Sequence, residues 1–233
     1  MLKSKVYLIP SVLDEGSIQT IPRYVVDAIK DSQVIFAENE RSARRFFKSI
    51  WKEMVIDSYE WFTIHNAEEA QVAVFKKKIN EGKNIAIISE AGCPGVADPG
   101  QILVHAAHQM NVMVKPLVGP SSILLALMAS GMNGQQFQFV GYLPIDSHQR
   151  LVRIKELEEE SIRKKCTQIF IETPYRNNQL IESVIKNARP STRFCIACDL
   201  TSDTEFVRSK TIAEWRAEKM DIHKRPAIFL MLG

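Results

Sequence analysis

The stretch "IAIISEAGCPGVADPG", residues 85–100, joins a short apolar run to a loop that is rich in turn-forming residues. Residues 85–88 are all aliphatic or small, which is typical of a buried strand. The next twelve residues contain three glycines, two prolines and two acidic residues, Glu90 and Asp98. Ordering such a loop costs conformational entropy, so we expect the loop to hold a ligand.

Strands and helices alternate through the first half of the chain. The hydrophobic pattern predicts strands at 5–9, 34–37, 85–88 and 112–117, and helices at 22–31, 41–50, 68–80 and 101–109. Residues 51–67, which are polar with several aromatics, are expected to form the connection into the helix at 68–80. Regular alternation of this kind predicts a parallel sheet with right-handed crossovers.

The second half of the chain has a different order of predicted elements. It predicts helices from "GPSS" (119–122) to near Gly131, at 150–165 and at 179–187, and strands at 137–140, 167–171, 193–198, 204–209 and 226–232. The strands at 193–198 and 204–209 are separated by a short polar link, which favours an antiparallel hairpin. We therefore expect an α/β protein with a parallel N-terminal sheet in domain 1–116 and a mixed C-terminal sheet in domain 117–233.

Composition and charge exclude several classes of protein. A formal charge of +3 over 233 residues neither requires nor excludes a polyanionic partner. The N-terminus lacks a small-residue cleavage site, and apolar runs such as 123–129 are much shorter than the roughly 20 residues that span a bilayer. Cys195 and Cys198 form a single C-x-x-C, which we interpret as part of a buried strand. We expect a cytoplasmic protein with no membrane partner and no metal site.

The predicted strand ends carry loops that suit a small-molecule ligand. In open α/β sheets, ligands bind beyond the carboxyl ends of the strands. The loops at that position are "IPSVLDEG" (9–16), "ENER" (38–41) and "SEAGCPG" (89–95). No strand is followed by G-x-G-x-x-G or by a P-loop, which argues against dinucleotides and nucleoside triphosphates. Each loop taken alone could also be an ordinary turn.

Five segments, in order and spacing, support a resemblance to a known family. They are "ISEAGCPGVADPG", "KPLVGPSSILLALMASGM", "FVGYLP", "IFIETPYR" and "CDLTSDTEFVR". These segments resemble the ribosomal RNA small subunit methyltransferase I family, within the tetrapyrrole methylase superfamily. The resemblance implies an S-adenosyl-L-methionine-dependent methyltransferase that forms a homodimer, with the cofactor in the cleft between two α/β domains. The members of this family that act on rRNA methylate a ribose 2′-oxygen.

Carried onto this sequence, the resemblance implies a set of cofactor contacts. They are Pro10, Glu90, Gly92, Cys93, Pro94, Val96, Ser121, Ser122, Glu172, Leu200, Pro226 and Ala227. Pro226 and Ala227 are expected to meet the adenine through backbone groups. Asp98 precedes Pro99 and the start of a helix, so we expect it to cap that helix.

Methyl transfer to a ribose hydroxyl needs a group that removes a proton late in the reaction. Glu38, at the end of the second strand, and His65 are the candidate catalytic residues. Each has a simpler interpretation. Glu38 lies near a helix start, where negative charge is favourable, and His65 could be a surface-loop residue.

Basic residues near these loops are candidates for binding a phosphate backbone. Arg41, Arg44, Arg45 and Lys48 follow helical spacing and share one helix face, which could equally be a solvated surface. Arg176 and Lys224, within "HKR" (223–225), could extend this substrate-binding patch. The aromatics of "EWF" (60–62) could stack a base, although a core position suits them better.

The predicted function is methyl transfer to RNA, most readily to a ribose of small-subunit rRNA. Several family motifs on the acceptor side are changed here, for example Ser-Asp-Ala-Gly-Thr-Pro to "SEAGCP". Two alternatives therefore stay open at this point. One is methylation of a tetrapyrrole or another small acceptor, and the other is a non-catalytic protein that binds S-adenosylmethionine.

Overall fold

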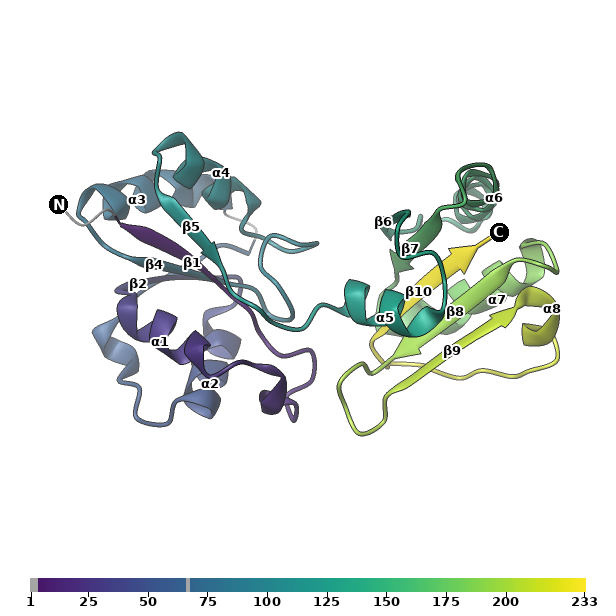
Figure 1. Ribbon diagram of the computed structural model, residues 1–233, viewed down its shortest axis with the longest axis horizontal. Helices are drawn as coiled ribbons and strands as arrows, with labels where there is room; N and C mark the ends of the chain where they lie inside the picture. Colours follow the sequence, from purple (N-terminus) through teal and green to yellow (C-terminus); the bar gives the residue numbers. More distant parts are fainter. Residues whose placement is uncertain (1–3, 66–67) are drawn as a thin grey trace. The chain divides into compact units, whose positions relative to one another are not determined.

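The computed structural model describes residues 4–65 and 68–233 and divides the chain into two compact units. The N-terminal unit is Met1–Ser121 and the C-terminal unit is Ser122–Gly233 (Figure 1). The division therefore falls at the start of a helix, a few residues after the boundary expected from the sequence.

The N-terminal unit is built on a parallel sheet. Within the described residues this sheet has five strands in the order β3-β2-β4-β1-β5. The strands are β1 (Lys5–Ile9), β2 (Val34–Ala37), β3 (Glu60–Thr63), β4 (Ile85–Ile88) and β5 (Met113–Pro116). All neighbouring pairs are parallel, with Ile85 of β4 opposite both Val6 and Val34. Every residue of β2 and β4 is buried, as expected for central strands covered on both faces.

Helices cover both faces of this sheet (Figure 1). The helices α1 (Tyr24–Asp31) and α2 (Glu40–Ile50) pack on one face, and α3 (Glu68–Asn80) and α4 (Gln101–Gln109) pack on the other. Two single-turn 3-10 helices, η1 (Ile18–Thr20) and η2 (Ile56–Ser58), lie in the connections. The helix α2 begins at a side-chain cap, because the side chain of Asn39 accepts hydrogen bonds from the backbone N–H groups of Arg41 and Ser42.

The parallel sheet predicted from the sequence is confirmed, but β3 was not predicted. This edge strand is only half-buried, so its hydrophobic pattern is weak. Its aromatic side chains belong to the core: the ring of Phe62 stacks on Phe36 at 5.1 Å, and the ring of Trp61 lies 5.9 Å from Phe47. The possibility that "EWF" stacks a base is therefore set aside.

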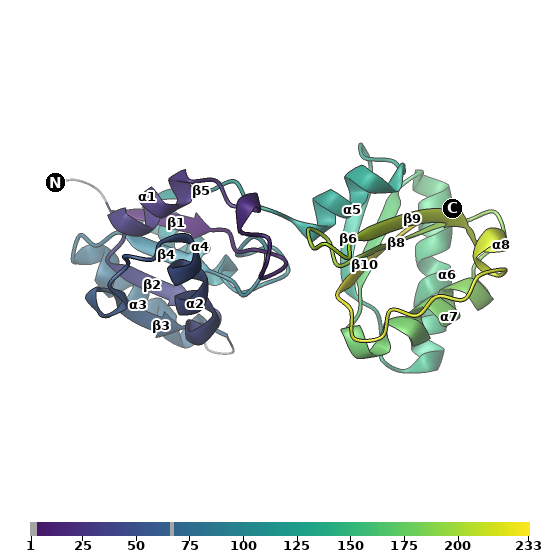
Figure 2. The ribbon, with the colours of Figure 1, turned by 90° about the horizontal axis from the view of Figure 1, so that it is seen from below.

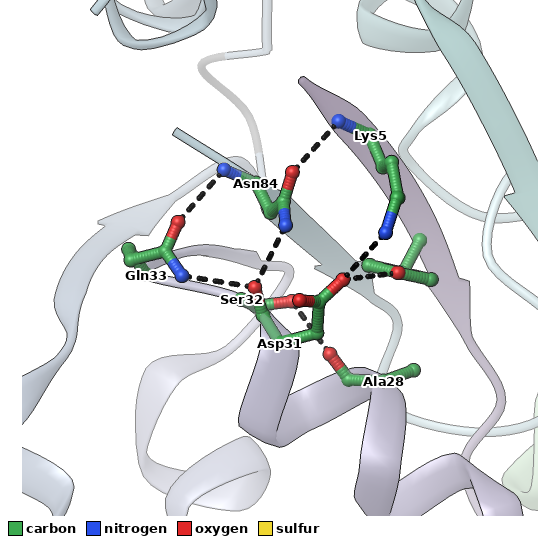
Figure 3. A network of polar contacts seen from close by, with 7 residues as sticks. Lys5, Ala28, Asp31, Ser32, Gln33 and Asn84 are labelled. Atoms are coloured by element: carbon green, nitrogen blue, oxygen red, sulfur yellow. Dashed lines mark hydrogen bonds and ion pairs between the residues drawn. The ribbon is translucent and has the colours of Figure 1, made fainter. Parts of the chain in front are cut away.

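A polar network closes the amino edge of the parallel sheet (Figure 3). The carboxylate of Asp31, at the end of α1, accepts hydrogen bonds from Lys5 Nζ and Tyr7 Oη of β1. Asn84 accepts a hydrogen bond from the backbone N–H of Lys5 and donates one to the backbone carbonyl of Asp31, both at 2.9 Å. These polar groups supply one another's hydrogen bonds. The network therefore has a structural role, because it joins the end of α1 to the edge at which β1 and β4 begin.

The C-terminal unit is built on a mixed sheet. The described part of this unit contains five strands in the order β6-β7-β10-β8-β9. They are β6 (Phe137–Tyr142), β7 (Thr167–Ile171), β8 (Arg193–Cys198), β9 (Phe206–Thr211) and β10 (Ala227–Leu232). The pair β6 and β7 is parallel and the other pairs are antiparallel, which confirms the predicted mixed sheet and the β8–β9 hairpin. Cys195 and Cys198 are both buried in β8, as the strand interpretation requires.

Helices also cover both faces of the mixed sheet (Figures 1 and 2). On one face lies α5 (Ser122–Ser130), against β8, β9 and β10. On the other face lie α6 (Ser147–Lys164), α7 (Asn177–Asn187) and the single turn α8 (Ile212–Trp215). The sequence pattern does not predict α8, which is held by a capping box between Thr211 and Glu214. The turn η3 (Pro174–Arg176) precedes α7. No helix in the described ranges has the length and apolar character needed to cross a membrane.

Candidate active site

The loop that follows β4 lies at the carboxyl edge of the parallel sheet. Gly92 has a φ of +71° and Gly100 a φ of +127°, a region of backbone conformation that side-chain-bearing residues rarely adopt. The backbone N–H of Gly95 donates to the carbonyl of Pro99 at 3.0 Å and closes the loop on itself. The glycines noted in the sequence therefore allow the backbone conformation of this loop.

Three strand-end loops meet at this edge. The backbone N–H of Ser11, after β1, donates to the carbonyl of Gly92 at 2.8 Å. The thiol of Cys93 contacts the carbonyl of Pro120, after β5, at 3.5 Å. A Cβ atom on Gly119 would collide with the ring of Pro10, so only glycine allows these two loops to approach. The structure thus brings Pro10, Gly92 and Cys93 together, as the sequence predicts.

Acidic residues that follow β2 and β4 are joined at the same edge. Glu38 Oε2 accepts a hydrogen bond from the backbone N–H of Glu90 at 2.9 Å. The hydroxyl of Ser42 contacts Glu90 Oε1 at 3.1 Å. The other oxygen of Glu38, Oε1, lies 3.7 Å from His65 Nδ1. The side chain of Glu38 is 13% exposed and that of His65 is 59% exposed, so the pair is open to solvent from the histidine side.

Asp98 joins this acidic group, and its expected role as a helix cap is wrong. The helix α4 begins after Gly100 without a side-chain cap, and the backbone N–H of Leu103 donates instead to Glu68 Oε1 at 3.0 Å. Burial raises the pKa of Asp98 to about 6, and the negative charges of Glu38 and Glu90 add to this effect. A hydrogen bond with Ser89 acts in the opposite direction. The pKa of Asp98 is therefore well above the ordinary value of a carboxyl group.

The cations of α2 do not form a uniform surface. Arg44 pairs with Glu40 at 2.5 Å and its guanidinium lies 5.1 Å above the ring of Trp61. Lys48 Nζ donates to two backbone carbonyls at the end of the helix. Arg45 pairs with Glu15 at 2.7 Å but stays largely exposed. Arg41 is exposed, and in the described part of the chain its side chain has no partner. Arg41 and Arg45 are thus the accessible members of the predicted patch.

In the C-terminal unit, Glu172 directly follows β7, and its side chain is fully buried. Its Oε1 atom accepts hydrogen bonds from the backbone N–H of Thr173 at 2.7 Å and from Arg176 Nε at 2.9 Å. Its Oε2 atom has no hydrogen-bond partner among the described residues. The pairing with Glu172 raises the pKa of Arg176. Arg176, which the sequence predicts to bind the substrate, is therefore ion-paired with the buried carboxylate of Glu172.

Ser122 begins α5, and the other predicted residues of this unit lie after the end of β8 or at the start of β10. Leu200 is buried just after β8, and Lys224 is exposed just before β10. The carbonyl of Pro226 accepts a hydrogen bond from the backbone N–H of Asp199 at 2.9 Å. The carboxylate of Asp199 also pairs with Arg225 at 2.6 Å, a contact that the sequence did not reveal.

The described residues fit the methyl donor expected from the sequence. A buried carboxylate oxygen without a donor, such as Glu172 Oε2, is costly unless a ligand supplies one. S-Adenosylmethionine carries ammonium and ribose hydroxyl donors that suit such an acceptor. Gly119, which approaches Pro10 closely, and Gly92 have no side chains that would cover the backbone. The main-chain groups of these loops therefore suit a ligand that is held by backbone contacts. Within the described ranges, no group of three His, Cys, Asp or Glu side chains is placed to hold a metal ion.

A family model described as "Tetrapyrrole (Corrin/Porphyrin) Methylases" matches residues 16–215. The chain therefore belongs to the tetrapyrrole methylase family and is an S-adenosylmethionine-dependent methyltransferase. The expected methyl donor is confirmed, and the alternative of a non-catalytic binding protein is set aside.

Curated relatives carry a more particular name. The chain is 29% identical over 231 residues to "Ribosomal RNA small subunit methyltransferase I" of Vibrio cholerae, across 97% of this chain and 76% of that protein. It is 31% identical over 207 residues to the protein of the same name from Micromonospora olivasterospora, across 88% of this chain and 62% of that protein. The crystal structure of diphthine synthase shares the fold, with a TM-score of 0.70, 13% identity, and coverage of 98% of this chain and 89% of that one.

Proposed function

We propose that this protein transfers a methyl group to small-subunit ribosomal RNA, at a ribose 2′-oxygen. One observation carries the proposal: the similarity to relatives named ribosomal RNA small subunit methyltransferase I extends over 97% of this chain. Because the similarity is not confined to a cofactor-binding segment, it includes the strand-end loops that would face the acceptor.

The acidic group of the N-terminal unit supports this chemistry. When bound, the cofactor supplies an electrophilic methyl carbon on a sulfonium. A ribose hydroxyl must lose its proton as it is methylated, and a carboxylate is a suitable acceptor. Glu38 is held in place by the backbone N–H of Glu90, while its second oxygen faces His65. We assign Glu38 as the proton acceptor and His65 as the exposed group that passes the proton to solvent.

The cofactor contacts in this proposal are those predicted from the sequence. In the N-terminal unit, the loops after β1, β4 and β5 are joined to one another and present backbone groups. In the C-terminal unit, Glu172 offers its second oxygen to a hydrogen-bond donor. The cleft, the homodimer and the cytoplasmic location expected from the sequence stay predictions.

The test uses the purified protein, labelled S-adenosylmethionine, and small ribosomal subunits from cells that lack the protein. The recovered rRNA is digested to nucleosides and analysed by mass spectrometry. A 2′-O-methylated nucleoside is the expected product. A base-methylated nucleoside would overturn the assignment of the acceptor atom. Absence of label in RNA, with transfer to a tetrapyrrole offered in a parallel reaction, would favour the small-acceptor alternative.

A further inference from the structure

Two exposed tyrosines lie at the carboxyl ends of the parallel strands β6 and β7. Tyr142 is the last residue of β6 and is 62% exposed. Tyr175 lies in the turn η3, shortly after β7, and is 68% exposed. Large aromatic side chains usually bury most of their surface, so two such residues at one sheet edge indicate a binding surface.

A β-bulge accounts for the position of Tyr142. Phe139 pairs with Ile169 and Tyr142 pairs with Ile171, so three steps along β6 match two along β7, leaving one extra residue in β6. Gly141, with a φ of +71°, supplies the backbone conformation for this irregularity. Bulges commonly redirect a side chain beside a functional site. The exposure of Tyr142 is thus built into the strand.

Tyr175 is held by a second loop, residues 221–225. The backbone N–H of Lys224 donates to the carbonyl of Pro174 at 3.0 Å. Asn178 ties down the same loop, because its side chain accepts from the backbone N–H of Ile222 at 3.0 Å and donates to Asp221 at 2.9 Å. These contacts fix the backbone beneath Tyr175 while its ring stays exposed. A preorganised aromatic ring loses little entropy when a ligand stacks on it.

A lysine and a histidine border Tyr175. Lys224 Nζ lies 5.7 Å from the centre of the Tyr175 ring, and the His223 ring meets it edge-on at 5.9 Å. Glu172 is ion-paired with Arg176, and the carboxylate of Asp221 is directed to the side chain of Asn178 and the backbone N–H of His223, from which it accepts hydrogen bonds. Lys224, whose ammonium lies beside the exposed Tyr175 ring, is therefore the cation of this surface that is placed to meet a phosphate.

Exposed aromatic rings beside cations match the chemistry of unpaired RNA, which presents both base faces and phosphates. We propose that Tyr142 and Tyr175 stack unpaired bases of the RNA substrate, with Lys224 contacting its phosphate backbone. This inference rests on the proposed function and names the residues that position the substrate. It also supplies the stacking surface that Trp61 and Phe62, both in the core, cannot provide.

The test measures steady-state methylation of small subunits by the full-length protein and three variants, Tyr142→Ala, Tyr175→Ala and Tyr175→Phe. Each alanine variant is expected to raise the KM for RNA about tenfold, because loss of base stacking typically costs about 1–3 kcal/mol. Tyr175→Phe keeps the ring and is expected to stay within about twofold of the wild type. S-Adenosylmethionine affinity, measured by calorimetry, is expected to be unchanged in all three.

Phe137→Ala is the matched control, because Phe137 is an exposed aromatic at the other end of β6. Melting temperatures establish that each variant is folded. An unchanged KM for RNA in both alanine variants would overturn the inference, as would a loss of cofactor affinity in place of RNA affinity. If the wild type does not methylate RNA at all, the proposed function fails instead, so the two failures are distinguishable.

Discussion

The two units of this protein present different chemistry at the edges where their strands end. In the N-terminal unit the edge is made of loops joined by main-chain contacts, with carboxylates from Glu38, Glu90 and Asp98. In the C-terminal unit the edge carries exposed tyrosines and cations, and its buried acid Glu172 is paired with Arg176. The first edge suits the removal of a proton and the second suits contact with bases and phosphates.

Sheet topology explains part of this difference. All strands of the N-terminal sheet are parallel, so every strand-end loop reaches the same edge, where the loops can bind one another. In the mixed sheet, β6, β7 and β8 end at the edge where β9 and β10 begin. Fewer loops crowd that edge, which leaves side chains such as Tyr142 and Tyr175 exposed. The comparison predicts that changes at the first edge affect the chemistry or cofactor binding, and that changes at Tyr142 and Tyr175 on the second edge affect RNA affinity.

The largest expected effect is that of Glu38→Gln. The glutamine can still accept the hydrogen bond from the Glu90 backbone N–H but cannot take up a proton. We expect kcat to fall about 100-fold or more, as for loss of a general base, with the KM for RNA and the affinity for S-adenosylmethionine unchanged. Glu40→Gln on α2, which only removes the pair with Arg44, serves as the control in the same assay. A kcat within a few-fold of the wild type would remove Glu38 from the chemistry.

Gly119→Ala tests whether the joined loops form the cofactor surface. The added Cβ collides with Pro10, so one of the two loops must move. Overpacking of this kind costs about 1–3 kcal/mol of stability, and we expect S-adenosylmethionine affinity to fall at least tenfold in calorimetry. Gly134→Ala is the matched control, because a Cβ there meets nothing within 4 Å. Normal cofactor affinity in Gly119→Ala would place the cofactor elsewhere.

Asp98→Asn tests the electrostatics of the acidic group. The pKa of Asp98 is raised from 3.8 to about 6 in the folded protein, so the folded state binds this proton more tightly than the unfolded state. Its contribution to stability therefore falls as pH rises from about 4 to about 6 and stays low above that. We expect the variant to gain about 1–2 kcal/mol relative to wild type at pH 8 and little at pH 4, allowing for partial exposure.

Urea unfolding at the two pH values measures this gain, with Asp57→Asn, at an exposed position, as the control. A gain of the same size at both pH values would mean that the carboxyl group of Asp98 does not titrate in this range.

The smallest expected effects distinguish Arg41 from Arg44 on α2. If Arg41 contacts an RNA phosphate, Arg41→Ala weakens RNA binding a few-fold and lowers the slope of log affinity against log salt by about one. Arg44→Ala leaves that slope unchanged but lowers stability by about 1 kcal/mol, because it loses Glu40 and the face of Trp61. Fluorescence anisotropy with labelled RNA and thermal unfolding measure the two effects. Slopes equal to that of the wild type in both variants would show that α2 is a solvated surface.

Sequence reasoning succeeded where the signal is local. Buried strands such as β2 and β4 are continuous apolar runs. The loop after β4 is recognisable from its glycines and prolines, because these residues have distinctive backbone conformations. It failed where a residue's role depends on partners distant in sequence. The edge strand β3 has a weak pattern. Asp98 does not cap α4 as expected, and the backbone N–H of Leu103 in its first turn donates to Glu68, 35 positions earlier in the chain.

The sequence by itself determined the alternation of strands and helices, the two kinds of sheet, and the family with its methyl donor. Tertiary structure alone decided that Asp98 joins Glu38 and Glu90, that Arg44 and Arg176 are already paired, and that Tyr142 and Tyr175 stay exposed. The physical reason is that hydrophobic periodicity and turn chemistry are local properties. Charge pairing, desolvation and exposure depend on which segments the fold brings together.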